Sequence, residues 1–217
     1  MKDAADAILH PEQAAYLEGI EPGRDPLLAE MEAYAKAKRQ PISDPEVASF
    51  LAVTARLSAA RSIVEVGTNI GYGAIVLARA AGPDARVITI ENDAETASVA
   101  RGFIGRAGLS SQIEVRQEDA LAALAVLSGE IDLVYIDCVK EHYPAYLDLV
   151  LPKLSARGVI IADNVLWKGL VAAKDVPPHE VGRVQALRTF NHSIVSDSRL
   201  RGVILPLGDG VAYAVRV

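Results

Sequence analysis

The chain has 217 residues, enough for one domain with a substantial core, and its 51% hydrophobic and 23% charged content is typical of a globular protein. Its formal net charge of −6 argues against non-specific binding to nucleic acid or to an anionic membrane. The single cysteine, Cys138, excludes an internal disulfide and a cysteine-rich zinc cluster.

The N-terminal segment and the apolar stretches of the chain predict a cytoplasmic protein. The segment Met1 to Leu17 carries Asp3, Asp6 and Glu12 and lacks the apolar centre of a signal peptide. No stretch of the sequence approaches the ~20 apolar residues that a membrane span needs. We therefore expect neither a membrane nor a nucleic acid as a partner.

Strand and helix patterns alternate along most of the chain. After a largely helical region from Met1 to about Leu57, the predicted elements are a strand at Ser62–Val66, a helix at Ile75–Ala81, a strand at Arg86–Ile90, a helix at Ala94–Gly108, a strand at Ile113–Arg116, a helix at Ala120–Leu127, a strand at Ile131–Ile136, a helix at Tyr143–Leu154 and a strand at Val159–Ala162. The strands are continuously apolar, as expected when helices cover both faces of a parallel sheet.

The end of the chain predicts a reversed edge to this sheet. Val203–Leu207 and Val211–Val217 flank Gly208-Asp209-Gly210, a pattern typical of an antiparallel hairpin. We therefore expect an α/β fold with a doubly wound, mostly parallel seven-stranded sheet and a C-terminal antiparallel hairpin.

We expect residues 1–217 to form a single domain in which residues 58–217 make the ligand-binding core. Ligands of doubly wound sheets bind at the carboxyl ends of the strands. The two regions outside the strand and helix alternation, residues 1–57 and Val165 to Glu180, are therefore candidates for the walls of a substrate site. The N-terminal region is also a candidate dimer contact.

A glycine-rich turn, Glu65 to Gly73, joins the first strand to a helix. Its glycines permit tight turning and close approach to a ligand, but their spacing is not the G-x-G-x-x-G of dinucleotide enzymes. Taken alone, the glycines fit a turn without a ligand equally well.

Glu91 ends the second strand, where it can accept hydrogen bonds from ribose hydroxyls, and Asp119 follows the third, within reach of an adenine amino group. Each of these two carboxylates is also typical of a helix N-cap, but their succession favours a nucleoside ligand.

The charge of the predicted site favours one nucleoside ligand over another. Carboxylates gather at the strand ends, and the glycine turn contains neither Arg nor Lys. A pyrophosphate would meet this acidic field at a cost, whereas a sulfonium cation with an α-amino group suits it. S-adenosylmethionine is therefore favoured over a nicotinamide cofactor.

Oxygen ligands follow the fourth and fifth predicted strands. Asp137 ends the fourth strand, and Asp163 and Asn164 end the fifth. Two carboxylates and an amide suit a hard cation, magnesium first, with manganese or calcium as alternatives, rather than zinc. Read alone, Asp163-Asn164 also fits an ordinary strand-end turn.

Lys140 follows Asp137 by three residues, so a helical turn returns it to the same side. Its ordinary pKa of about 10.4 is too high for a base at neutral pH. A nearby metal and a sulfonium would lower that pKa by disfavouring the ammonium. The competing interpretation of a lone loop lysine is a solvated surface charge.

From about Pro41 to Val217 the sequence resembles the cation-dependent O-methyltransferases, the family of the caffeoyl-CoA and catechol O-methyltransferases. The matching motifs are Glu65-Val66-Gly67-Thr68 with Gly71-Tyr72, Ile136-Asp137 with Lys140 and Tyr143, Asp163 to Trp167 with Gly169, and Leu205 to Gly210. The resemblance implies a class I methyltransferase fold, a homodimer and transfer of a methyl group to one hydroxyl of a small catechol-like aromatic substrate.

The resemblance also implies roles for particular residues. Lys140 is expected to be the catalytic base, and Asp137, Asp163 and Asn164 the metal ligands. The residues expected at the S-adenosylmethionine site are Ile42, Glu65, Gly67, Thr68, Tyr72, Gly73, Glu91, Asp119, Ala120 and Asp137.

Two positions depart from the family pattern. Gly73 stands where the family commonly has a serine that meets the methionine end of the cofactor. Lys168 stands where plant members often have Asn, which argues against a plant-type CoA-ester substrate. The alternatives left open are a metal-independent methyltransferase, a nicotinamide-dependent oxidoreductase and a non-enzymatic binding module.

Overall fold

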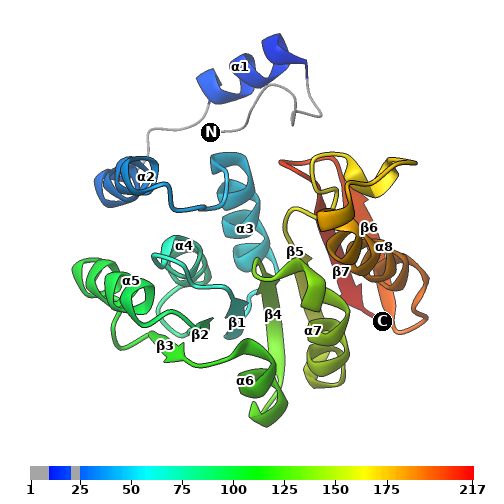
Figure 1. The fold of residues 1–217 in the computed structure, drawn as a ribbon. Coiled ribbons are helices and arrows are strands. Elements are labelled where there is room, and N and C mark those ends of the chain that lie inside the picture. Colours follow the sequence, from blue (N-terminus) through cyan, green and yellow to red (C-terminus); the bar gives the residue numbers. More distant parts are fainter. Residues whose placement is uncertain (1–9, 21–24) are drawn as a thin grey trace.

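The structure, a computed structural model, describes residues 10–20 and 25–217 (Figure 1). A seven-stranded sheet with the order β3-β2-β1-β4-β5-β7-β6 forms its centre. The strands are β1 (Ser62–Val66), β2 (Arg86–Glu91), β3 (Ile113–Gln117), β4 (Ile131–Ile136), β5 (Leu154–Ala162), β6 (Leu200–Leu205) and β7 (Val211–Arg216). Strands β1 to β5 pair in parallel, and β7 is antiparallel to both β5 and β6. The predicted doubly wound sheet with a C-terminal antiparallel hairpin is confirmed.

Helices connect the strands and precede the sheet. The α-helices are α1 (Pro11–Ile20), α2 (Pro26–Lys38), α3 (Pro45–Leu57), α4 (Tyr72–Ala81), α5 (Ala94–Arg106), α6 (Ala120–Val126), α7 (Tyr143–Val150) and α8 (Val181–Ser196). Short 3₁₀ helices are η2 (Lys140–His142), η3 (Leu151–Lys153), η4 (Leu170–Ala172) and η5 (Pro178–Glu180). In the part of the chain that the structure describes, no helix is long and apolar enough to cross a membrane. Residues 1–9 and 21–24 of the predicted N-terminal region lie outside the described residues.

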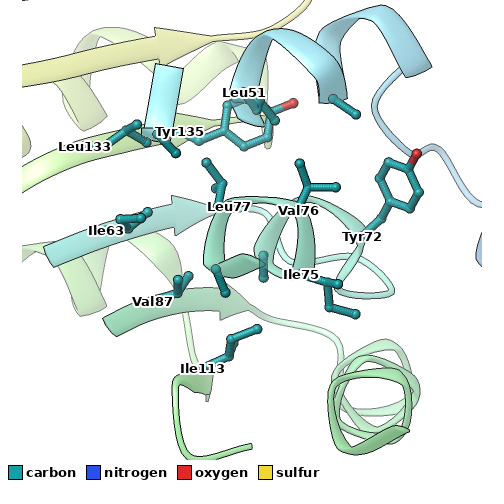
Figure 2. Packing of buried hydrophobic residues seen from close by; sticks show 14 of the residues in the cluster. Leu51, Ile63, Tyr72, Ile75, Val76, Leu77, Val87, Ile113, Leu133 and Tyr135 are labelled. Atoms are coloured by element: carbon teal, nitrogen blue, oxygen red, sulfur yellow. The ribbon is translucent and has the colours of Figure 1, made fainter. Parts of the chain in front are cut away.

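Both faces of the sheet are buried, which explains why the strand sequences are continuously apolar. Ile63, Leu133 and Tyr135 of β1 and β4 pack with α3, α4 and α5. The strand residues that pack with α6, α7 and α8 are Val64, Val66, Ile131, Val134 and Ile136. Figure 2 shows Leu77 of α4 among Ile63, Leu133 and Tyr135 of the sheet and Leu51 of α3. The two helical layers leave the strand ends as the part of the sheet that can meet a ligand.

Two strands begin three residues or more before the predicted position because of tertiary contacts. Strand β5 begins at Leu154 rather than Val159, since Leu154 pairs with Ile131 before an irregularity in the β4–β5 register. Strand β6 is Leu200–Leu205 rather than Val203–Leu207. Its Gly202 allows close approach of α8, because a Cβ there would lie 2.1 Å from the carbonyl oxygen of Ile194.

Two helices also differ from the prediction by three residues or more at one end. Helix α4 begins at Tyr72 rather than Ile75, because Gly71 takes the N-cap position with a φ of +87°. Helix α7 ends at Val150 rather than Leu154, because Pro152 cannot continue the α-helical hydrogen bonding and lies in the following 3₁₀ helix η3. The earlier start of α4 places the predicted site residues Tyr72 and Gly73 in its first turn rather than in the preceding loop.

Candidate active site

The side chains selected from the sequence lie at the carboxyl ends of neighbouring strands of the sheet. Backbone hydrogen bonds continue the strand pairing beyond the last strand residues: Asp137 N donates to Val66 O at 2.9 Å, and Asp163 N donates to Ile136 O at 3.0 Å. Asp137 and Asp163 therefore leave paired strands side by side. In a doubly wound sheet, this edge is where ligands bind.

The loop after β1 closes over the end of β4. The N–H groups of Gly67 and Thr68 both donate to the carbonyl of Ile90 at 3.1 Å. Gly67 has a φ of +103°, and a Cβ there would lie 2.1 Å from the carbonyl oxygen of Asp137. Only glycine permits this approach, which brings the predicted cofactor loop against Asp137.

Glu65 directs its carboxyl into the protein, and only 1% of the residue is exposed. Burial raises the pKa of Glu65 to about 8. The charges of Asp137 and Glu91 also raise this pKa, whereas a hydrogen bond from Thr89 lowers it. A cationic group beside Glu65 would therefore favour its ionised form.

Glu91 connects the loop after β1 with the loop after β2. Its Oε2 accepts from Asn69 N at 2.9 Å, and its Oε1 accepts from Asp93 N at 3.0 Å. Asn69 has a φ of +46°, and its side-chain amide donates to the carbonyl of Pro41. This contact brings the segment that contains Ile42 to the predicted cofactor loop.

Asp119 and Ala120 mark the start of α6. Asp119 Oδ1 accepts from Ala122 N at 2.9 Å, so Asp119 is the N-cap of α6. The capping contact uses one carboxylate oxygen and does not exclude the predicted contact with an adenine amino group. Ala120 is buried beneath it.

Lys140 lies in η2 and is only 6% exposed, so it is not a solvated surface charge. Its Nζ donates to Asp137 Oδ1 and to the hydroxyl of Tyr143, each at 2.8 Å. Burial alone would lower the pKa of Lys140, but Asp137 and Tyr143 outweigh it and raise that pKa above its ordinary value. The lowering expected from the sequence therefore requires an additional positive charge at this site.

Tyr143, which the sequence offered only as part of a matching motif, also joins the site. Its hydroxyl lies 3.1 Å from the carbonyl oxygen of Ile136 and 3.0 Å from that of Asp163, while it accepts from Lys140. Its ring packs edge-on against Phe190 of α8. Tyr143 thus ties Lys140 to the ends of both β4 and β5. The three-residue spacing from Lys140 was the signal in the sequence.

Asp163 contacts Tyr135, which in turn contacts Ser43, and the sequence identified neither of these two residues. The hydroxyl of Tyr135 donates to Asp163 Oδ2 at 3.3 Å, and it lies 2.8 Å from Ser43 Oγ. Asp163 Oδ1 accepts from the N–H of Asn164 at 2.7 Å. Burial, reinforced by the charge of Asp137, raises the pKa of Asp163 to about 7. No local pattern distinguishes Tyr135 or Ser43 from core residues, because their partner is remote in sequence.

The donor set at this edge suits a hard divalent cation. Asp137 and Asp163 offer carboxylates and Asn164 an amide oxygen, the ligands that magnesium and calcium prefer. The electrostatic repulsion that raises the pKa of Asp163 would be relieved by a cation bound to both carboxylates. Within residues 10–20 and 25–217 there is no group of three or more His, Cys, Asp or Glu side chains that could hold a metal ion.

The loop after β5 is held by the β6–β7 turn and by α8. Asp209 Oδ1 accepts from Lys168 N at 2.8 Å. The indole of Trp167 donates to Glu180 Oε2 at 2.9 Å and lies under the guanidinium of Arg183, 4.6 Å from the ring centroid. Trp167 therefore anchors this loop, and one of its faces is occupied within the chain.

Tyr72, expected at the cofactor site, has its hydroxyl engaged elsewhere. The hydroxyl donates to Glu32 Oε1 of α2 at 2.7 Å, and Figure 2 shows the ring projecting from the start of α4. In this arrangement the residue connects α2 to the start of α4. Its backbone stays next to the cofactor loop.

Comparisons with known proteins agree on one family. A family model described as O-methyltransferase matches residues 24–217. The chain is 36% identical over 202 residues to a catechol O-methyltransferase of Niastella koreensis, covering 88% of this chain and 90% of that protein. It is 38% identical over 184 residues to a catechol O-methyltransferase of Mycobacterium tuberculosis, covering 83% and 82%. The crystal structure of an O-methyltransferase from Bacillus cereus in complex with SAH superposes with a TM-score of 0.83 at 31% identity, covering 95% and 97%.

Proposed function

The chain belongs to the O-methyltransferase family, and we propose that it methylates one hydroxyl of a small aromatic substrate with vicinal hydroxyls, with the help of a divalent cation. It is an S-adenosylmethionine-dependent O-methyltransferase. The nicotinamide-dependent oxidoreductase considered from the sequence is thereby set aside. The proposal concerns the cation, the acceptor and the residues that act on them.

One observation carries the proposal. Asp137, Lys140, Asp163 and Asn164 come together at adjacent strand ends, with Asp137 directly against Gly67 of the predicted cofactor loop. A methyl donor in the loop and an acceptor beside the carboxylates would then be neighbours. Holding two reactants in position is a large part of what an enzyme contributes to a bimolecular transfer.

In the proposed reaction, an acceptor hydroxyl loses its proton and its oxygen attacks the methyl carbon of the sulfonium. The carbon–sulfur bond breaks, and neutral S-adenosylhomocysteine leaves. A divalent cation bound by Asp137, Asp163 and Asn164 would orient two adjacent substrate oxygens and favour loss of the proton. Lys140 is the proposed base, and as an ammonium it would instead stabilise the oxyanion from the same position.

The segment that contains Ile42 and the loop anchored by Trp167 are the proposed walls of the acceptor site. Both reach the same edge of the sheet through contacts described above, namely Asn69 with Pro41 and Asp209 with Lys168. The names of the related catechol O-methyltransferases support a catechol-like acceptor. A homodimer is part of the proposal, and sedimentation velocity tests it.

The test is methyl transfer from labelled S-adenosylmethionine to a panel of catechols. The assay is run after EDTA treatment and again after addition of Mg²⁺, Mn²⁺ or Ca²⁺. We expect activity to disappear with EDTA and to return with metal. Activity that persists in EDTA would establish the second candidate, a metal-independent methyltransferase, and would reassign Asp163. Turnover of single-hydroxyl but not vicinal-hydroxyl acceptors would overturn the proposed substrate class.

A further inference from the structure

Three polar side chains form a row across the sheet beneath the proposed cofactor site. Thr89, Glu65 and Tyr135 occupy equivalent register positions on the neighbouring strands β2, β1 and β4. All three are at most 1% exposed and lie on the sheet face that α3 and α4 cover with apolar side chains. Tyr135 is seen in this layer in Figure 2. Burying polar groups in an apolar layer is unfavourable unless they are hydrogen-bonded.

Hydrogen bonds join this row to the cofactor loop in a defined direction. The hydroxyl of Thr89 donates to Glu65 Oε2 at 2.5 Å. When Glu65 is ionised, Thr89 uses its one hydroxyl proton on Glu65, so the 2.6 Å contact between Thr68 and Thr89 is then a donation from Thr68. Thr68 is in the cofactor loop and is only 2% exposed. The position of the Glu65 carboxyl is thus set by a chain of two hydroxyls that begins in the loop.

The second oxygen of Glu65 faces Gly73, at the start of α4. A Cβ at Gly73 would lie 2.2 Å from Glu65 Oε1 and 3.4 Å from the ring of Tyr135. Gly73 has an ordinary helical backbone conformation, so no turn requires a glycine at this position. The close approach of the Glu65 carboxyl, which leaves no room for a Cβ, is the reason for the glycine. A serine at this position, as the family commonly has, would displace the carboxyl from where Thr89 holds it.

We propose that Thr89 is a positioning residue for the methyl donor: together with Thr68 and the space left by Gly73, it holds the Glu65 carboxylate where it receives the α-ammonium of S-adenosylmethionine. The inference rests on the proposed cofactor site. It assigns to Glu65 and Thr89 the orientation of the methionine end, to which a serine hydroxyl would otherwise contribute.

The hydrogen bond from Thr89 also acts on the charge of Glu65. Asp137 and Glu91 are the charged groups that face this carboxyl and disfavour its ionisation, together with burial, and Tyr135 is the titratable neighbour on β4. Thr89 donates to the ionised form and so favours the state that pairs with an ammonium. Removing its hydroxyl leaves the carboxyl buried with less support.

The test is calorimetric binding of S-adenosylhomocysteine to the full chain between pH 6 and 9. The variants are Thr89→Val, which keeps shape and removes the hydroxyl, Thr89→Ser, which keeps it, and Thr89→Ala as a second removal in case Thr89→Val does not fold. Glu65→Gln is made alone and together with Thr89→Val. Thr54→Val, at a buried threonine near the C-terminal end of α3, is the matched control.

We expect Thr89→Val to weaken binding about tenfold and to move the rise of affinity with pH to higher pH, because a charge-assisted hydrogen bond to Glu65 is lost. Thr89→Ser and Thr54→Val should stay within about threefold of the original chain. In the Glu65→Gln background, Thr89→Val should have little further effect, since it acts through Glu65.

The outcomes separate the inference from the proposed function. If the original chain does not bind S-adenosylhomocysteine, the proposed cofactor site and the inference both fail. If it binds, and Thr89→Val binds equally well with an unchanged pH profile, only the inference is wrong. The inference is also wrong if Thr89→Val weakens binding equally with and without Glu65, because Thr89 would then act on the fold in general.

Discussion

The ammonium of Lys140 lies 2.8 Å from Asp137 Oδ1 and 2.8 Å from the hydroxyl of Tyr143. Tyr143 in turn reaches the carbonyl of Asp163, so one lysine connects the ends of two strands. This arrangement pairs the buried ammonium of Lys140 with the partly buried carboxylate of Asp137 without a metal. A metal cation bound to Asp137 would either displace the Lys140 ammonium from this carboxylate or bind beside it and add a second positive charge.

Replacing Asp163 should separate cation binding from folding. Asp163→Asn keeps the size of a buried side chain while removing one of two anionic donors. We expect turnover to fall by about 100-fold or more and Mn²⁺ binding, followed by electron paramagnetic resonance, to weaken in parallel. Asp148→Asn, at an exposed position of α7, is the control. Unchanged Mn²⁺ binding in Asp163→Asn would remove Asp163 from the cation site.

Lys140→Met tests the proposed base. The methionine fills a similar volume without the ammonium, and loss of a general base typically lowers the rate about 10²- to 10⁴-fold. We expect kcat to fall within that range while the affinity for S-adenosylhomocysteine changes little. Arg157→Met, at an exposed position in the first half of β5 and away from the carboxyl ends of the strands, should behave like the original chain. A Lys140→Met variant with normal kcat would show that the proton leaves by another route.

The buried Glu65 should make stability depend on pH. The pKa of Glu65 is about 8 in the folded chain, against an ordinary value of 4.5. Between pH 4.5 and pH 8 the folded state therefore retains a proton on Glu65 that the unfolded state has lost. The free energy of unfolding should therefore fall as pH rises from about 4.5 to about 8, by up to ~1.4 kcal/mol per pH unit from this group.

Urea unfolding in EDTA across this pH range measures the effect. Glu65→Gln should flatten the slope, whereas part of the slope should remain because the pKa of Asp163 is also raised, to about 7. Glu95→Gln, at an exposed position in the first turn of α5, serves as the control. Identical slopes with and without Glu65 would contradict the burial of an ionisable carboxyl at this position.

Two glycines with positive φ should respond very differently to alanine. Gly67, with φ +103°, has the Asp137 carbonyl oxygen 2.1 Å from a built Cβ, whereas Gly129, with φ +90°, has nothing within 4 Å. Gly129→Ala should cost about 1 kcal/mol, the strain of a left-handed backbone alone. Gly67→Ala should cost about 3 kcal/mol or more, because backbone must move as well. Equal losses in urea unfolding would mean that the loop after β1 can shift freely.

The short-range sequence pattern of this chain was enough to predict the sheet and the residues at the carboxyl ends of its strands. Apolar runs bounded by Gly, Asp or Asn indicate strands and their ends, and parallel strands bring their carboxyl ends to one edge. Asp137, Lys140 and Asp163 could be selected for this reason, without knowledge of any contact between them.

The features that the sequence pattern did not predict depend on contacts formed in the folded chain. Strand β6 includes Gly202 because α8 approaches it closely, although glycine is unfavourable within strands in general. Ser43, Tyr135 and Thr89 read as ordinary core or strand residues, and their roles depend on partners 21 to 92 positions away. The raised pKa of Lys140 also depends on the folded chain, because Asp137 and Tyr143 outweigh the lowering effect of burial only once the three side chains meet. Local sequence specifies which side chains reach a strand end, whereas hydrogen-bond partners and electrostatic environment are properties of the assembled tertiary structure.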